Sequence, residues 1–219
     1  MKNISPLKRT ILNSIADDAI AHFIFAHGAG ANMHHEFMQV MTKLLLKQHI
    51  SVTRFNFCYM DRREDENKRF PPDRMPKLLE CYQQVLAELE TDLPVFIGGK
   101  SMGSRVAATM LTDDIMLSKS VQGLICLGYP FHPSKKPENL RLLPLQHCLK
   151  PTLIIQGERD TLGSKDEILA YSLPNSCQIE FLPDGDHSLK PRVKSGYGYE
   201  QHLQTTSRLI ANFINENIT

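Results

Sequence analysis

The fold of this chain is decided by residues 93–103, which read Leu93-Pro94-Val95-Phe96-Ile97-Gly98-Gly99-Lys100-Ser101-Met102-Gly103. The apolar residues 93–98 predict a buried β-strand, and residues 102–111 predict a helix. The residues between them fit the pattern G-x-S-x-G, in which a serine lies on a sharp strand-to-helix turn with its hydroxyl exposed. Glycines on both sides let the strand and the helix approach each other. Ser101 is therefore the candidate nucleophile.

Short apolar runs alternate with helical patterns along the rest of the chain. The predicted strands cover residues 19–26, 50–57, 93–98, 121–127, 151–156 and 178–182. The predicted helices cover residues 33–48, 75–90, 102–111, 165–171 and 201–217. This alternation is typical of a parallel sheet covered on both faces. We expect an α/β fold with a doubly wound, mostly parallel sheet of about six strands, whose ligands bind at the carboxyl ends of the strands.

Composition and charge predict one ordinary domain. The length of 219 residues suits a single domain over 1–219, and no linker composition divides it. Residues 59–74 are densely charged and predict a solvated loop that could rim a pocket. Residues 129–150 are irregular and could form a short flap, so we expect only a minimal lid.

The same composition limits the partners and the location. A net charge of +1 and the lack of a basic stripe argue against a nucleic-acid partner. The five scattered cysteines contain no C-x-x-C pair, which favours reduced thiols over disulfides or a zinc site. No signal peptide and no apolar run long enough to span a bilayer are visible. We therefore expect a cytoplasmic protein, and the sequence does not indicate its oligomeric state.

Two nucleotide-binding motifs and a metal site can be rejected. A phosphate-binding loop ending in Gly99-Lys100-Ser101 would require a glycine where the chain has Pro94. A dinucleotide fingerprint beginning at Gly28 would place its third glycine on Met33. His34-His35 has no third ligand at metal spacing and is better explained as a polar helix start. No cofactor and no metal are predicted.

A serine hydroxyl needs a base, and the base needs a carboxylate to orient it. Chain order Ser, then Asp or Glu, then His fits this arrangement, each residue following a strand. Asp160 follows the strand predicted over residues 151–156, and His187 follows the one predicted over residues 178–182. Asp160 has rivals in three nearby acids, which are Glu158, Asp184 and Asp186. Asp160 is preferred because it lies furthest along its turn, so the predicted catalytic residues are Ser101, Asp160 and His187.

The reaction would also need two donors for the negative charge of a tetrahedral intermediate. The backbone N–H of Met102 is the first candidate, since it begins a helix directly after the nucleophile. The second is the backbone N–H of Ala29, in the turn His27-Gly28-Ala29-Gly30 after the first predicted strand. A plain strand-to-helix turn would explain these glycines equally well. Lys100 and Arg105 flank the nucleophile and could either favour an anionic substrate or lie on the surface.

With these residues identified, the chain resembles the α/β-hydrolase superfamily. More narrowly, it is similar to the predicted-hydrolase branch that includes testis-expressed proteins and a regulatory subunit of a histone acetyltransferase complex. The matching stretches are His27-Gly28-Ala29-Gly30, Arg54-Phe55-Asn56-Phe57, Gly98-Gly99-Lys100-Ser101-Met102-Gly103, Gly128-Tyr129-Pro130-Phe131-His132-Pro133, Gln156-Gly157-Glu158-Arg159-Asp160 and Asp184-Gly185-Asp186-His187-Ser188. Cys58 and Ser104 depart from the pattern of the branch, which tends to have proline and glycine there.

The resemblance implies the α/β-hydrolase fold and supports Ser101, Asp160 and His187 as the catalytic residues. It implies no substrate, and some members of the branch serve as parts of larger complexes. The first hypothesis is a serine hydrolase that cleaves a small or medium carboxylic ester or thioester through an acyl-enzyme. The second is a non-catalytic binding or scaffold module that keeps the fold. Acyl transfer and peptide cleavage use the same residues and stay open.

Overall fold

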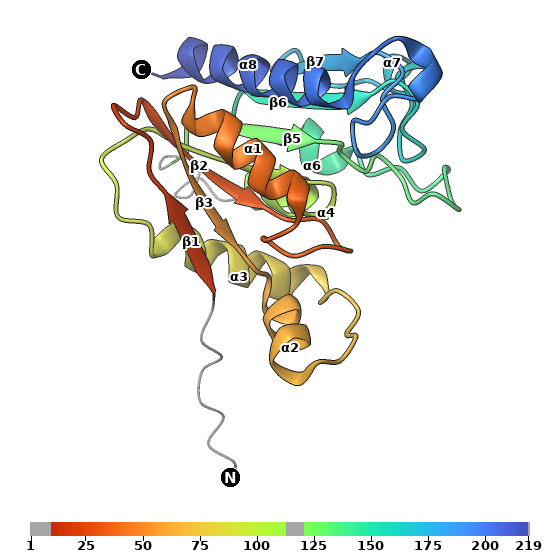
Figure 1. Cartoon of the computed structure of the whole chain (residues 1–219). Coiled ribbons are helices and arrows are strands. Elements are labelled where there is room, and N and C mark those ends of the chain that lie inside the picture. The colour runs from red at the N-terminus through yellow and green to blue at the C-terminus, as the bar shows by residue number, and fades with distance from the viewer. Residues whose placement is uncertain (1–9, 113–120, 219) are drawn as a thin grey trace.

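A seven-stranded sheet organises the chain in the computed structural model, which describes residues 10–112 and 121–218 (Figure 1). The strands are β1 (Ile11–Ser14), β2 (Ala21–Ala26), β3 (Ile50–Phe55), β4 (Val95–Lys100), β5 (Gly123–Leu127), β6 (Thr152–Gly157) and β7 (Cys177–Leu182). Their order across the sheet is β1-β3-β2-β4-β5-β6-β7. β1 pairs with β3 antiparallel, and the other pairings are parallel. The predicted doubly wound α/β fold is confirmed.

Helices cover both faces of this sheet. They are α1 (Glu36–Leu46), α2 (Cys58–Glu66), α3 (Met75–Ala87), α4 (Met102–Met110), α6 (Leu143–Gln146), α7 (Lys165–Leu169) and α8 (Tyr199–Asn217), with a 3₁₀ turn at Val193–Ser195. α1 and α8 pack together over one face, while α3 and α4 pack over the other. Among the described residues, no helix is both long enough and apolar enough to cross a bilayer.

The sheet supplies both halves of the core because successive strand residues point to opposite faces. In β2, Phe23 and Phe25 pack under α1 and α8, whereas Ile24 and Ala26 pack toward α3 and α4. All four side chains are fully buried. Burial on both faces explains why the central strands read as continuous apolar runs in the sequence.

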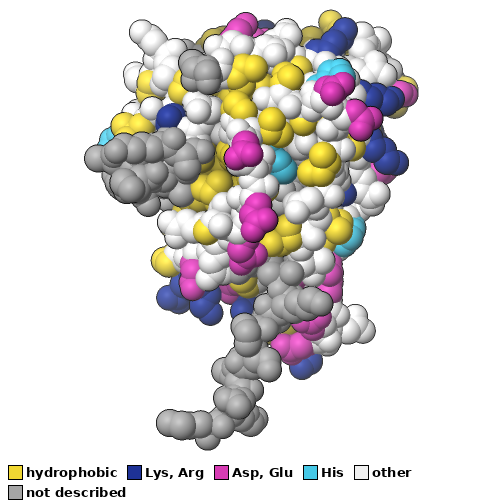
Figure 2. All heavy atoms as spheres, turned by 90° about the vertical axis from the view of Figure 1, so that its left-hand side faces the viewer, with side chains coloured by type: hydrophobic (Ala, Val, Ile, Leu, Met, Phe, Trp, Pro, Cys, Tyr) yellow, Lys and Arg dark blue, Asp and Glu magenta, His cyan; other side chains and the backbone are white. Residues whose placement is uncertain are grey.

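The carboxyl ends of the parallel strands meet at one edge of the sheet, on the right of Figure 1, where the arrowheads of β5 and β7 point. Figure 2 shows the opposite side of the molecule, at the amino ends of the strands. Apolar, acidic and basic side chains are interspersed over that face, and the basic ones lie mainly near its margins. Loops that could carry a site are therefore concentrated at the carboxyl ends.

Three strands or α-helices differ from the sequence-based prediction, namely β1, α2 and the short α6, which lies within the segment 129–150 that was expected to be irregular. β1 was not predicted, because its four residues form a partly exposed edge strand with little alternation. α2 occupies the first half of the segment 59–74, which was predicted to be a solvated loop, and Asn67 ends the helix in the left-handed conformation with φ 48°. α2 is strongly polar, yet it buries Tyr59, Met60 and Asp61. Contacts with neighbouring elements therefore stabilise α2, and its sequence has no apolar periodicity from which the helix could be predicted.

Three glycines let β4 and α4 lie against their neighbours. A Cβ atom on Gly98 would stand 1.9 Å from the carbonyl oxygen of Ile125 in β5. On Gly99 or Gly103 it would stand 2.6 Å from the carbonyl oxygen of Ala26, at the end of β2. Real Cβ atoms do not approach backbone so closely, so any side chain here would push the strands and the helix apart.

We expect Gly98→Ala to lower the free energy of unfolding by about 2–4 kcal/mol, since neither the β5 backbone nor the added methyl group can move aside freely. Urea denaturation followed by circular dichroism measures the change. Gly30→Ala is the matched control, because a Cβ there meets nothing within 4 Å. Equal stability of the two variants would contradict the proposed close packing.

Candidate active site

Ser101 lies at the carboxyl end of β4, directly before α4. Its backbone has φ 52° and ψ −112°, a conformation that costs a non-glycine residue strain energy. Its N–H donates to the carbonyl of Leu127 at 3.0 Å, which fixes the turn to the end of β5. The close approach allowed by Gly103 holds α4 in place below it. A serine in such a strained strand-to-helix turn projects its hydroxyl above the sheet, as the G-x-S-x-G pattern predicts.

The structure brings Ser101, His187 and Asp160 into one chain of hydrogen bonds. His187 Nε2 lies 2.8 Å from Ser101 Oγ, and His187 Nδ1 lies 2.7 Å from Asp160 Oδ2. The three residues come from the ends of β4, β6 and β7. Because Nδ1 faces a carboxylate, it carries the ring proton and leaves Nε2 to accept the proton of the serine hydroxyl.

Asp160 is fully buried, and its carboxylate is held on both oxygens. Oδ1 accepts the backbone N–H of Leu162 at 2.8 Å, and Oδ2 also accepts the side-chain amide of Gln156 at 2.8 Å. These donors fix the carboxylate toward the imidazole. Gln156 was not singled out in the sequence, although a buried polar residue at the end of an apolar strand is a signal that could have identified it.

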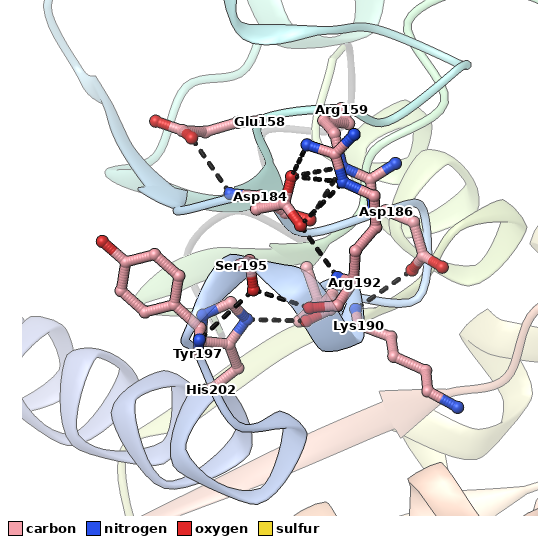
Figure 3. A network of polar contacts seen from close by, with 10 residues as sticks. Glu158, Arg159, Asp184, Asp186, Lys190, Arg192, Ser195, Tyr197 and His202 are labelled. Carbon is pink, nitrogen blue, oxygen red and sulfur yellow. Dashed lines mark hydrogen bonds and ion pairs between the residues drawn. The ribbon is translucent and has the colours of Figure 1, made fainter.

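The three rival acids take other positions. Asp184 accepts hydrogen bonds from Arg192, and its carboxylate also lies 2.9 Å from Arg159. Glu158 accepts from the N–H of Asp184 at 3.0 Å, while Asp186 accepts from the N–H of Lys190 at 3.0 Å. Figure 3 shows these groups in a polar network that joins the loop after β6 to the loop that carries His187. The rivals therefore hold the two loops in place, whereas Asp160 is the carboxylate that contacts His187.

The two candidate oxyanion donors come from two segments next to Ser101, the start of α4 and the connection between β2 and α1. Met102 begins α4, so its N–H is among the helix N–H groups that lack an intrahelical acceptor. Ala29 lines the cavity at Ser101, in the connection between β2 and α1. A Cβ built on Gly28 would be 3.6 Å from the Ser101 Cβ, so this connection runs directly past the serine.

The connection between β2 and α1 is anchored to the end of β3. Asn56 accepts the N–H of Met33 through its side-chain oxygen at 3.0 Å, and Arg54 donates to the Met33 carbonyl at 2.9 Å. His27 Nε2 accepts the N–H of Phe57 at 3.0 Å, and burial lowers the pKa of His27 to about 4. His27 is thus a neutral structural residue that joins the two segments.

Tyr59 completes this anchoring from α2. Its hydroxyl donates to the carbonyl of Ala29 at 3.0 Å, and burial raises its pKa, so it remains a donor. Because a peptide is planar, fixing the Ala29 carbonyl also restricts the N–H of the next residue. Because residues 59–74 were predicted to form a loop, this contact could not be predicted from the sequence.

Lys100, the residue before the candidate nucleophile, also contacts the histidine loop. Its ammonium group donates to the backbone carbonyl of His187 at 2.6 Å. Gly128 makes room for it, since a Cβ there would stand 2.8 Å from Lys100 Nζ. Burial lowers the pKa of Lys100 to about 8, although Asp160 and Asp186 oppose this shift. Lys100 therefore lies inside the site rather than on the open surface.

A cavity of about 380 Å³ opens above Ser101. Its walls come from the β2–α1 connection, the first residues of α1, the histidine loop and the start of α8, with Phe37, Met38 and Tyr199 supplying apolar surface. Residues 129–150 supply none of the described lining residues.

Among the described residues, no three His, Cys, Asp or Glu side chains are grouped to hold a metal ion. His35 is the N-cap of α1, as predicted for a polar helix start.

The site thus combines a serine hydroxyl, an imidazole and a buried carboxylate beside a mainly apolar cavity. The sequence profile of the α/β hydrolase domain matches residues 19–215. The chain belongs to this α/β hydrolase family. The profile does not test whether the chain belongs to the branch that includes testis-expressed proteins and an acetyltransferase-complex subunit. Membership of that branch therefore stays a prediction.

Solved structures of α/β hydrolases share the fold at low sequence identity. A dienelactone hydrolase from Anabaena variabilis is 17% identical, with a TM-score of 0.69 over 95% of this chain and 92% of that one. Est1E from Butyrivibrio proteoclasticus is 12% identical, with a TM-score of 0.67 over 94% of each chain. XC6422 from Xanthomonas campestris, described as a serine hydrolase without a lid, is 18% identical, with a TM-score of 0.61 over 91% and 88%.

The acid limb of the stability profile should report the network around Asp184. Hydrogen bonds from Arg192 lower the pKa of Asp184 from 3.8 to about 2. A carboxyl group whose pKa is lower in the folded state stabilises the protein above its unfolded pKa, and this contribution is lost as the pH falls toward 2. We expect Asp184→Asn to be less stable at pH 7 and to lose less stability than the parent between pH 4 and pH 2.

Urea denaturation at a series of pH values measures both effects. Asp65→Asn removes an exposed carboxylate from α2 and serves as the control, with an acid limb like that of the parent. If the Asp184→Asn and parent curves run parallel from pH 7 to pH 2, Asp184 does not have the lowered pKa.

Proposed function

We propose that this α/β hydrolase is a serine hydrolase that cleaves small or medium carboxylic esters or thioesters, with Ser101, His187 and Asp160 as its catalytic residues. The observation that carries the proposal is the continuous hydrogen-bond chain from Ser101 Oγ through the imidazole to a buried carboxylate. The strained backbone of Ser101 supports it, because such strain persists where a fold over-determines it and is typical of active sites.

In the first half of the reaction, Ser101 Oγ attacks the carbonyl carbon while His187 Nε2 takes the hydroxyl proton. The carbonyl π electrons move to its oxygen, which is stabilised by the N–H groups of Met102 and Ala29. The bond to the leaving group then breaks, and His187 returns the proton to the departing alcohol or thiol. Asp160 stays ionised and stabilises the imidazolium.

Water completes the cycle in the second half. It attacks the acyl-enzyme as His187 accepts one of its protons, and the serine then leaves with that proton while the acid is released. An acceptor alcohol or amine in place of water would give acyl transfer, and an amide substrate would give peptide cleavage. Hydrolysis is the proposed outcome, because the cavity above Ser101 opens to solvent and admits water.

Covalent labelling by a fluorophosphonate probe tests the nucleophile. We expect the wild-type protein to be labelled and Ser101→Ala to be unlabelled, with esterase turnover reduced by at least about 10⁴-fold. Ser172→Ala, which changes an exposed serine, should label like the wild type. A folded wild-type protein that resists the probe and co-purifies with a stable partner would instead favour a non-catalytic scaffold module.

The size of the acyl group follows from the dimensions of the cavity. A volume of about 380 Å³ without a covering domain suits short to medium chains. With 4-nitrophenyl esters from acetate to palmitate, kcat/KM should peak at a short or medium chain and fall for the longest ones. A steady rise up to palmitate would contradict this substrate range. The structurally similar XC6422 is likewise described as a serine hydrolase without a lid.

We also propose that the protein acts in the cytoplasm, on the basis of its scattered cysteines and ordinary charge. The net charge of +1 and the lack of a basic stripe in the sequence support a small-molecule substrate rather than a nucleic acid.

A further inference from the structure

A second cavity lies on the other side of the turn at Ala29 and Gly30, which line both cavities. Its volume is about 550 Å³, and three cationic residues at the end of α2 and in the following loop line it, namely Arg63, Lys68 and Arg69. No acidic residue is among its described lining residues. A concave surface with this lining would attract and hold an oxyanion.

The acids of α2 and of the segment that follows it are mostly engaged elsewhere. Glu64 accepts from Asn32 at 2.6 Å and from Asn56 at 3.2 Å, which ties α2 to the neighbouring connections. Asp61 also accepts from Asn56, and Asp73 is paired with Arg62 at 2.7 Å. Glu66 lies 3.3 Å from Lys68 and partly balances it. Within the described part of the chain, Arg63 and Arg69 take part in no ion pair, so their charges remain available.

Arg63 is held in position before any ligand arrives. Its Nε donates to the carbonyl of Phe70 at 2.5 Å, and its guanidinium lies over the Tyr59 ring, 5.0 Å from the ring centroid. Tyr59 in turn donates to the carbonyl of Ala29. The guanidinium is therefore fixed through Tyr59 to the turn that faces Ser101, and its terminal nitrogens are left for a ligand.

The side of the site away from the second cavity is lined by apolar and acidic residues instead of cationic ones. The first cavity continues into a groove of about 340 Å³ between α1 and α8, and the two share His35, Phe37 and Tyr199. Val40 and Leu203 add apolar surface to the groove, while Glu36 and Glu200 would repel an anion. In Figure 1, α8 and α2 lie on opposite sides of α1, so the apolar and cationic regions are separated across the site.

We propose that the substrate is an ester or thioester with an apolar acyl group and an anionic leaving group. The acyl chain occupies the first cavity and the groove between α1 and α8. The carboxylate, sulfonate or phosphate of the alcohol or thiol lies in the second cavity, against Arg63 and Arg69. This assignment rests on the proposed hydrolase activity and specifies the substrate class for the same site.

Paired thioesters test the assignment. S-butyryl thioesters of ω-mercaptoalkanesulfonates with two to six carbons are compared with those of ω-mercaptoalkanols of equal length, and thiol release is followed by absorbance. Rates are corrected for hydrolysis without enzyme. One chain length should let the sulfonate reach past the turn at Ala29 and Gly30 into the second cavity. At that length, the sulfonate thioester should have a kcat/KM about tenfold higher than its neutral partner, because charge-assisted hydrogen bonds form only with the anion. Raising the ionic strength should reduce this preference.

Substitutions identify where the anion binds. Arg63→Met keeps an aliphatic chain on the Tyr59 ring, and Arg69→Gln removes an exposed charge. Each should reduce the preference by about threefold or more, measured within each variant as the ratio of kcat/KM for the sulfonate to kcat/KM for its neutral partner. Arg63→Lys should restore part of the preference. Lys77→Gln removes an exposed cation of α3 that lines neither cavity and should leave the preference intact.

The outcomes separate the two proposals. If the neutral thioesters are cleaved without any preference for the sulfonates, the anionic substrate class is overturned while the hydrolase activity stands. A preference that survives both arginine substitutions would place the anion elsewhere and would also overturn the assignment. If neither series is cleaved, the hydrolase activity itself fails and the substrate class fails with it.

Discussion

The contact between the start of α4 and the end of β2 is the constraint on which the rest of the structure depends. Gly103 lies so near Ala26 that a Cβ would be 2.6 Å from its carbonyl oxygen. This contact leaves the chain no room for a relaxed turn, and Ser101 takes a strained backbone conformation with φ 52°. The strain is sustained by two buried cores, one on each face of the sheet. The position of the serine hydroxyl is therefore set by rigid elements rather than by a flexible loop.

The loops after β6 and β7 are held by polar contacts instead of apolar packing. Gly157 brings them together, since a Cβ there would stand 2.3 Å from the carbonyl of Asp186. Glu158, Arg159 and Arg192 then converge on Asp184 (Figure 3), and Lys100 ties the His187 carbonyl to β4. Because each loop is fixed from several directions, His187 can remain aligned with both Ser101 Oγ and Asp160. The partly exposed imidazole of His187 is thereby kept in one orientation, although no apolar core surrounds it.

The connection between β2 and α1 has a different part in the site. It passes beside Ser101, and it separates an apolar cavity from a cationic one. Contacts from β3 and α2 fix it at Met33 and Ala29. The same side chain, Tyr59, supports this turn and the guanidinium of Arg63. The geometry around the reacting carbonyl and the charge beyond it are therefore coupled through one aromatic ring.

The sequence by itself determined the alternating architecture, the turn at Ser101 and the three residues that meet there. It could do so because strand periodicity, glycine placement and chain order are local or sequential properties. It did not reveal β1, whose pairing with β3 supplies hydrogen bonds that no local pattern records, nor α2, whose polar residues become helical through contacts with distant segments. The roles of Gln156, Tyr59 and Lys100 were also decided only by tertiary structure. Each acts through a partner far along the chain, and such contacts depend on how the strands are ordered in space rather than on the residues beside them.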